Sequence, residues 1–260
     1  MTTLAEATTP AADGTLVIAP GWRQGRGAFG GLTIAAAIRA IELRVADPRR
    51  LVRSVTAELP GPTVVGTARF AVEILRSGSS VTVARAALEQ NGDVTTHAVA
   101  ILAATRDAGD IAWRELAMPQ APDWRTLHEM PWNEQFPEFS RHFAYRIVAG
   151  IPFRRDANST LGWIAAREPG APRDAAYIAA LMDAWFPAVL VRIAAPRPLA
   201  TIAYTLEIVD GLDGLDPAAP LLYRGTVPVA ANGYFLETRE LWGSDGRLVA
   251  LNHQTFAVIR

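Results

Sequence analysis

GSSVTVARAALEQNG at residues 78–92 and NGYFLETRELWGSDG at residues 232–246 decide the fold, because they repeat one pattern about 150 residues apart. In each, an arginine stands seven residues from a glycine or asparagine on either side, as in Gly78, Arg85 and Gly92 and in Asn232, Arg239 and Gly246. Both stretches are rich in β-branched or aromatic residues and contain Asn-Gly or Asp-Gly, which favour tight turns. Each therefore predicts a β-hairpin.

The neighbouring segments repeat as well. The hairpins continue into expected strands at residues 94–103 and 247–259, and extended segments precede them at residues 51–59 and 199–209. Ahead of each sheet we predict one helix, GLTIAAAIRAIELR at residues 31–44 and DAAYIAALMDAWFPAVLVRI at residues 174–193. This order, given twice, predicts an α+β double hotdog, in which two antiparallel sheets each wrap a central helix. Two unrelated hairpins could share the spacing by chance, but the matching helices favour duplication.

The repeat divides the chain into two units and a crossover. We expect an N-terminal hotdog at residues 1–108 and a C-terminal hotdog at residues 154–260. Residues 109–153, rich in Trp, Pro and acidic residues without a sustained period, are expected to form a linker over the surface.

Composition excludes several classes of function. The formal net charge is −1, which gives no field for nucleic acid or an anionic membrane, so neither is an expected partner. The absence of cysteine removes disulfides, thiolate metal sites and a cysteine nucleophile. No apolar run reaches the roughly 18 residues of a membrane span, and no leader pattern opens the chain, so we expect a cytoplasmic protein.

Asp183 is the strongest candidate for a functional residue. Between residues 175 and 186, all residues except Asp183 are apolar, apart from Tyr177 with its hydroxyl group. A helix that is apolar on all sides is buried. A carboxylate on such a helix must be paired, hydrogen-bonded or functional, since burying a lone charge is costly. The alternative is that Asp183 reaches solvent beyond the sheet edge, near the break at Pro187. A buried carboxyl suits general-base activation of water.

Six blocks of the sequence, in this order, resemble those of acyl-CoA thioesterase II (TesB-like) proteins. They are AFGGLTIAAAIRA (28–40), LVRSVTAELPGP (51–62), LRSGSSVTVARAALEQNG (75–92), GWIAAREPGAPRDAAYIAALMDAWFP (162–187), PLATIAYTLE (198–207) and LVALNHQTFAVIR (248–260). The resemblance implies hydrolysis of an acyl-CoA to free acid and CoA. It also implies an Asp, Thr or Ser, and Gln set that orients water without a covalent intermediate, and these fall on Asp183, Thr201 and Gln254. Taken singly, Thr201 and Gln254 could equally be ordinary strand residues.

Gly30 and Gly31 at the start of the first helix are candidates for an oxyanion or substrate-binding site, because free N–H groups there favour negative charge. The alternative is a tight turn with close packing. Some family members carry a histidine where this chain has Thr56, which puts any histidine-dependent mechanism there in doubt. None of the four histidines receives a catalytic role, and no metal or cofactor is expected.

Two rival functions remain open at this point. A non-catalytic acyl-CoA-binding protein would keep the fold without turnover, although the complete Asp, Thr and Gln set disfavours it. A hotdog dehydratase or hydratase needs a paired His and Asp, for which the sequence offers no block. The need to cover edge strands suggests a homodimer or a higher homo-oligomer.

Overall fold

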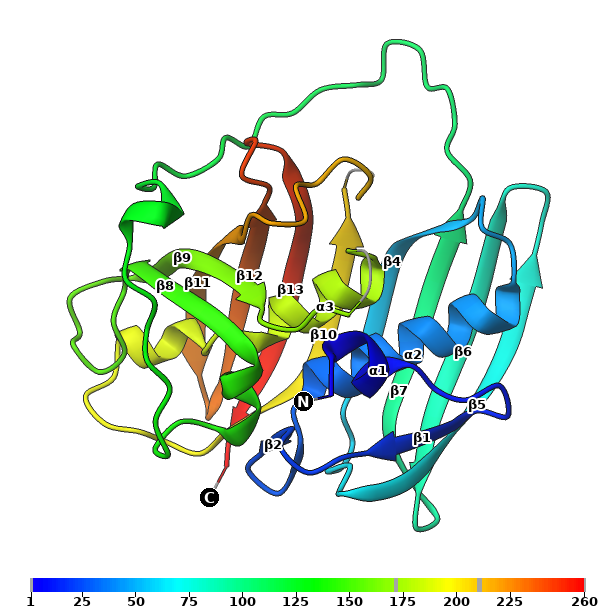
Figure 1. The fold of residues 1–260 in the computed structure, drawn as a ribbon, viewed down its shortest axis with the longest axis horizontal. Coiled ribbons are helices and arrows are strands. Elements are labelled where there is room, and N and C mark those ends of the chain that lie inside the picture. The colour runs from blue at the N-terminus through cyan, green and yellow to red at the C-terminus, as the bar shows by residue number, and fades with distance from the viewer. Residues whose placement is uncertain (1, 171–172, 210–211, 260) are drawn as a thin grey trace.

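The computed structural model describes residues 2–170, 173–209 and 212–259, and its main element is one antiparallel sheet of 11 strands (Figure 1). In spatial order the first five strands are β1 (Thr15–Ile18), β5 (Gly66–Ser77), β6 (Val81–Gln90), β7 (Asp93–Ala103) and β4 (Leu51–Glu58). The sheet continues with β10 (Leu199–Ile208), β13 (Leu248–Val258), β12 (Tyr234–Trp242), β11 (Leu221–Ala231), β9 (Ser159–Ala166) and β8 (Phe143–Ala149). A separate two-stranded ribbon is formed by β2 (Arg23–Gln24) and β3 (Gly27–Ala28).

Both predicted hairpins are present, as β6 with β7 and as β12 with β13, and β4 and β10 occupy the predicted extended segments. The expectation of two separate sheets is wrong. β4 and β10 pair antiparallel from Glu58 with Ala203 to Ser54 with Glu207, so the two halves form one continuous sheet. Without this pairing, β4 and β10 would each be an edge strand with unpaired backbone N–H and C=O groups.

Two helices lie on one face of this sheet and pack against each other (Figure 1). The first, α2 (Gly30–Val45), agrees with the predicted helix to within one residue at each end. The second, α3 (Ala175–Ala184), is about half as long as predicted and is followed by the 3₁₀ turn η3 (Ala188–Val191). The cause is Pro187: it cannot continue the hydrogen-bonding ladder, and Trp185 is already extended at φ −69° and ψ 141°.

The main core lies between the sheet and these helices. Residues 34–38 of α2 and 178–182 of α3 are 0% exposed. Both segments contain consecutive alanines, Ala35 to Ala37 and Ala179 to Ala180, which allow the two helices to approach closely. Burial of these segments, rather than helix propensity, accounts for most of the stability of the helices.

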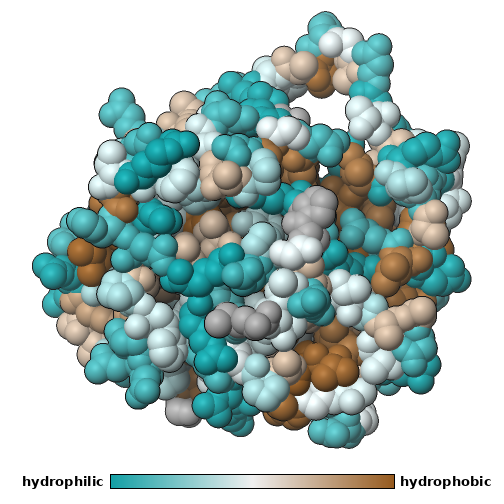
Figure 2. Space-filling view, viewed as in Figure 1, coloured by the Kyte–Doolittle hydropathy of each residue, from teal (hydrophilic) through white to brown (hydrophobic). Residues whose placement is uncertain are grey.

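The crossover between β7 and β8 runs as an extended arc, and part of it projects from the body of the molecule (Figures 1 and 2). Further along, it contains η1 (Trp124–Thr126) and η2 (Glu138–His142). Its apolar side chains pack on a second cluster that includes Trp163 and Trp242. β8 falls inside the range expected to be linker, because its FAYRIVA sequence is a short edge strand without a clear alternating pattern.

The remaining helix, α1 (Leu4–Thr8), contacts α2 and α3. In the part of the chain that the structure describes, no helix combines the length and the apolar character needed to cross a membrane.

Candidate active site

Asp183 lies in the last turn of α3, where that helix meets the first turn of α2. The Gly31 N–H donates to Oδ2 of Asp183 at 2.6 Å, joining residues that are 152 positions apart in the sequence. The start of a helix carries partial positive charge, so a carboxylate is stabilised there. The residue is half-buried, whereas every other residue of α3 is buried. Asp183 is therefore the residue of α3 that lies nearest to the edge of an apolar environment.

The two glycines make this approach possible. A Cβ on Gly30 would lie 2.6 Å from Leu59 Cδ1 and 3.1 Å from Asp183 Oδ2. A Cβ on Gly31 would lie 2.9 Å from the Cβ of Asp183. The close-packing interpretation of Gly30 and Gly31 is thus supported by the geometry. The Gly31 N–H is engaged by Asp183, and the oxyanion role of the two glycines stays a prediction.

Gln254 on β13 and Thr201 on β10 extend the site from the sheet side. Thr201 Oγ1 donates to Gln254 Oε1 at 3.2 Å, and Gln254 is 2% exposed. Gln254 Nε2 donates to Asn252 Oδ1 at 3.0 Å, and Asn252 Nδ2 donates to the Thr205 carbonyl oxygen at 2.7 Å. This chain of hydrogen bonds fixes the orientation of the Gln254 amide.

A β-bulge explains why Thr201 faces the helices. Gln254 is paired with Tyr204, whose side chain is buried, so in a regular strand Thr201, three residues away, would point to the opposite face. The register shifts between Thr201 and Ala203, which pairs Thr201 with the buried Phe256. The extra residue, Ile202, returns Thr201 to the inner face.

The structure thus brings together the three side chains singled out from the sequence. Burial raises the pKa of the Asp183 carboxyl above its ordinary value. The nearby charge of Arg239, the Gly31 N–H and an interaction with Gln254 each lower the pKa and so oppose that rise. A carboxylate with a raised pKa is chemically suited to accept a proton from a water molecule that reaches it.

Beneath Asp183 lies a fully buried ion pair that the sequence analysis did not identify. Arg239 Nε donates to Glu237 Oε1 at 2.9 Å, and each residue is 1% exposed. Both lie on β12 and alternate with outward-facing residues, on the same face as the buried Phe235 and Leu241. The sequence did contain a signal for this pair, because both charged residues stand at the positions of β12 where the alternating pattern places apolar residues.

Buried tyrosines from the sheet also bind the backbone of α3, one in the middle of the helix and one at its C-terminal end. Tyr145 OH donates to the Ala184 carbonyl oxygen at 2.9 Å, and Tyr204 OH donates to that of Ala179 at 3.1 Å. Burial raises the pKa of both tyrosines, so both hydroxyls stay protonated. The bond from Tyr145 satisfies the Ala184 carbonyl, which the end of the helix leaves without a helical partner, and the bond from Tyr204 gives the mid-helix Ala179 carbonyl an additional donor. The α3 segment that carries Asp183 is therefore held rigidly.

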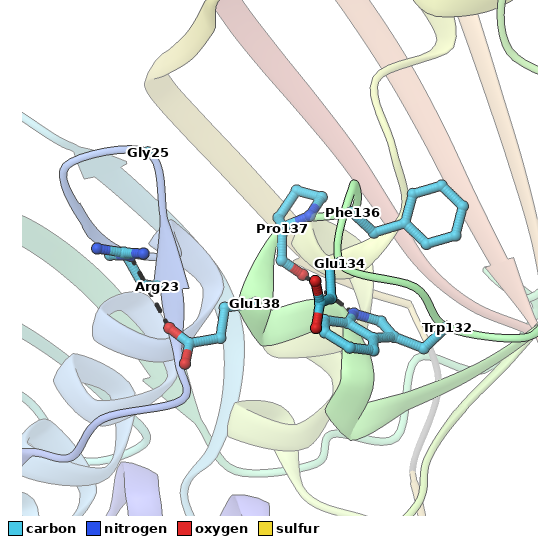
Figure 3. Close-up of a pocket in the computed structure, with 7 residues that line it drawn as sticks. All are labelled: Arg23, Gly25, Trp132, Glu134, Phe136, Pro137 and Glu138. Carbon is cyan, nitrogen blue, oxygen red and sulfur yellow. Dashed lines mark hydrogen bonds and ion pairs between the residues drawn. The ribbon is translucent and has the colours of Figure 1, made fainter.

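A surface pocket of about 300 Å³ lies beside the β2–β3 ribbon, and it is not lined by Asp183, Thr201 or Gln254 (Figure 3). Its residues are Arg23, Gly25, Trp132, Glu134, Phe136, Pro137 and Glu138. An aromatic stack at 4.3 Å between Phe139 of η2 and Phe29, which precedes α2, connects this region to the site described above. The pocket combines one arginine with two glutamates, whereas Asp183 is surrounded by apolar residues of α3.

Comparison with solved structures identifies the fold. The chain is similar to a hot dog fold protein of unknown function from Alicyclobacillus acidocaldarius, with a TM-score of 0.89, 23% identity and coverage of 99% and 98% of the two chains. It is similar to a candidate thioesterase II from Thermobifida fusca, with a TM-score of 0.82, 19% identity and coverage of 100% and 98%. It is also similar to the acyl-CoA thioesterase II TesB2 of Mycobacterium marinum, with a TM-score of 0.71, 23% identity and coverage of 88% of each chain. At these identities the likeness establishes a hotdog fold.

Family models add the sequence relationship. No functionally curated protein matches the sequence. The acyl-CoA thioesterase N-terminal domain matches residues 18–103, and the acyl-CoA thioesterase C-terminal domain matches residues 114–258. The resemblance seen in the six sequence blocks is confirmed, and with it the class of enzyme, a thioester hydrolase. The chain belongs to the acyl-CoA thioesterase family.

Proposed function

We propose that this protein hydrolyses an acyl-CoA to the free acid and CoA by direct attack of a water molecule that Asp183, Thr201 and Gln254 orient. The observation that supports this most is the position of Asp183, a half-buried residue on an otherwise apolar helix, whose carboxylate accepts from the Gly31 N–H at 2.6 Å. Serine or cysteine chemistry is not needed, since the carboxylate can generate the nucleophile from water.

In the proposed reaction the water oxygen attacks the thioester carbonyl carbon while Asp183 accepts a proton from that water. The carbonyl oxygen carries the negative charge of the tetrahedral intermediate until it collapses. The C–S bond then breaks, and protonated Asp183 returns the proton to the CoA thiolate. The carboxylate ends the cycle ionised, so it acts as general base and then as general acid.

Thr201 and Gln254 serve as the water-binding groups. The Thr201 hydroxyl uses its hydrogen on Gln254 Oε1, which leaves its lone pairs free to accept a hydrogen bond from water. One hydrogen of Gln254 Nε2 is donated to Asn252 Oδ1, and the other points toward the Asp183 carboxylate, where it can be shared with the oxygen of a bound water. One hydrogen bond donated by the water to Thr201 and one accepted from Gln254 would fix its orientation. This reduces the entropy lost on reaching the transition state.

We extend the proposal to the architecture and the assembly. The continuous sheet is interpreted as two fused hotdogs, residues 1–108 and 154–260, joined by the crossover at residues 109–153. A homodimer or a higher homo-oligomer is the proposed assembly, and the cytoplasm is the proposed location.

Two measurements test this function. Thiol release is followed from a panel of acyl-CoAs that differ in chain length; the chain has no cysteine, so a thiol reagent reports CoA alone. Turnover of at least one acyl-CoA is expected, whereas tight binding without thiol release would identify a binding protein and overturn the proposal.

A single turnover in H₂¹⁸O with enzyme in excess tests the route. Direct attack by water is expected to place one ¹⁸O in the acid product of the first turnover. An unlabelled acid, with ¹⁸O transferred to the protein, would show that Asp183 forms a covalent anhydride and would contradict the water mechanism.

A further inference from the structure

The buried pair of Glu237 and Arg239 lies directly below Asp183 and is not needed to fill the core. Replacing a buried ion pair by apolar side chains of similar volume is often neutral or stabilising. The pair therefore requires an explanation other than packing, and its contacts with α3 supply one.

The pair holds the chain on both sides of Asp183. An Arg239 guanidinium nitrogen donates to the carbonyl oxygen of Met182, the residue before Asp183. Glu237 Oε2 accepts from the Ala188 N–H at 2.9 Å, beyond the break at Pro187. The C-terminal turn of α3, with the catalytic carboxylate on it, is thus fixed to β12 at two points.

The geometry indicates that Glu237 is ionised. Besides Ala188, its partners are Arg239 Nε at 2.9 Å and Tyr223 OH at 3.1 Å, so all three are donors. Burial raises the pKa of Glu237, and these three contacts oppose the rise. Burial alone would lower the pKa of Arg239, but Glu237, Tyr223 and Asp183 raise it above its ordinary value. Arg239 is therefore a permanent cation within the field of two carboxylates.

The charged and titratable groups that act on Asp183 come from four strands. β12 contributes Arg239, whose charge Glu237 partly neutralises, while β8, β10 and β11 contribute Tyr145, Tyr204 and Tyr223. Burial raises the pKa of each of these tyrosines, so all three stay neutral. From the other side α2 contributes the Gly31 N–H. Among these groups Arg239 is the one cation, and it lies where the C-terminal end of α3 carries partial negative charge.

We propose that Arg239 is a positioning residue that keeps the Asp183 carboxylate ionised and correctly placed, and that Glu237 limits the strength of this effect by neutralising part of the Arg239 charge. The proposal rests on the proposed function in one respect, the role of Asp183 as the base. Neither residue touches the substrate in this account.

Opposite pH shifts in two variants test the proposal. Glu237→Gln keeps the size of the side chain but leaves the Arg239 charge unneutralised, which lowers the pKa of Asp183. The acid limb of the kcat/KM profile should therefore shift to lower pH by about 1 unit. Glu237→Gln/Arg239→Gln removes both charges, including the cation that favours ionised Asp183. The acid limb should therefore shift to higher pH by about 1 unit. The matched control is Glu73→Gln/Arg85→Gln, which removes the exposed ion pair formed by the repeat counterpart of Arg239 in the first half. It should leave the profile unchanged.

Titration of the Asp183 side-chain carboxyl by ¹³C NMR gives a readout that is independent of turnover, with the resonance assigned by its loss in Asp183→Asn. The same two opposite shifts are expected there. If folded variants, as judged by circular dichroism, keep the wild-type pKa of Asp183, the proposal is wrong. Should the single variant not fold, the comparison of wild type with the charge-neutral double variant decides. Full activity of Asp183→Asn would overturn the proposed function, while the NMR titration would still decide this inference.

Discussion

Each of the two helices sends a charged side chain to the start of the other, and the two contacts differ in chemistry. Asp183 of α3 accepts from the Gly31 N–H at the start of α2. Arg39 of α2 instead forms an ion pair at 2.8 Å with Asp174, the residue that caps α3. The first contact joins a carboxylate to an uncharged backbone N–H, whereas the second pairs two opposite charges.

The surroundings of the two helix starts differ in the same way. Gly92 and Gly246 are matching positions of the two repeats. Gln254 stands eight residues after Gly246, and its counterpart, eight residues after Gly92, is the fully buried Ala100. Arg39 also binds Thr8 of α1 at 3.0 Å, so α1 closes this end of the helix pair. The proposed function thus places one reactive locus in each chain, at the contact of Asp183 with Gly31, while the contact of Arg39 with Asp174 joins the two helices at their other end.

The Gln254→Ala variant should give a large loss of activity, because the amide both orients water and contacts Asp183. We expect kcat/KM to fall about 10²- to 10³-fold, in the range seen when one preorganised donor is removed. The matched control is Gln90→Ala in the first half, whose amide binds the Val64 backbone. That variant should lose thermal stability while its activity per folded molecule stays the same; equal losses of activity would contradict the asymmetry.

The Gly31→Ala variant should push the helices apart at the reactive locus. The new Cβ would meet Asp183 Cβ at 2.9 Å and the Ala180 carbonyl oxygen at 3.1 Å. Overpacking of this kind costs about 1–3 kcal/mol of unfolding free energy, and we expect roughly tenfold lower activity as the carboxylate shifts. Gly61→Ala is the control, since nothing lies within 4 Å of its Cβ position. Chemical denaturation and kcat/KM together check both effects.

The Thr201→Val variant removes one hydrogen bond to Gln254 and one acceptor for water while keeping the shape of the side chain. One hydrogen bond contributes about 1 kcal/mol net to stabilisation of the transition state, so kcat/KM should fall by roughly a factor of 5 to 10. The control is Thr96→Val, which removes the buried hydroxyl bond to Thr33 at 2.9 Å in the first half. A loss in the control as large as in Thr201→Val would show that the effect is structural.

The Asp183→Asn variant should be more stable than the wild type at neutral pH. Because the folded pKa of Asp183 is raised, the folded state binds the proton more tightly than the unfolded state, so stability falls as pH rises above the unfolded pKa. Asparagine removes that penalty, and we expect a gain of roughly 0.5–2 kcal/mol at pH 7. The gain should disappear toward pH 4. Denaturation curves at both pH values check the sign, and a variant that is less stable at pH 7 would contradict it.

Local patterns in the sequence predicted most of the elements around the site. The turn dipeptides located both hairpins, and the lone carboxylate on an apolar helix singled out Asp183. Thr201 and Gln254 came from the family resemblance, because a strand threonine or glutamine has no distinguishing local pattern. The early end of α3 was signalled by Pro187, although the apolar run continues past it.

Other features depend on contacts that no local pattern encodes. The pairing of β4 with β10 joins strands about 150 residues apart, so the single sheet was not evident. Arg85 and Arg239 occupy the same place in the repeat, yet Arg85 is exposed and paired with Glu73, whereas Arg239 is 1% exposed. Arg239 lies on the inner face of β12, which the helices cover, whereas Arg85 alternates with the buried residues of β6 and lies on the outer face.

The most direct test compares two aspartates of the same helix pair. Asp183→Asn and Asp174→Asn each replace one carboxylate by an amide of equal size, at the reactive locus and at its counterpart. For thiol release from one acyl-CoA at pH 7, we predict that Asp183→Asn lowers kcat/KM by about 10²- to 10⁴-fold and that Asp174→Asn changes it less than threefold. Equal activity of the two variants, or a larger loss in Asp174→Asn, would contradict the assignment of the chemistry to Asp183.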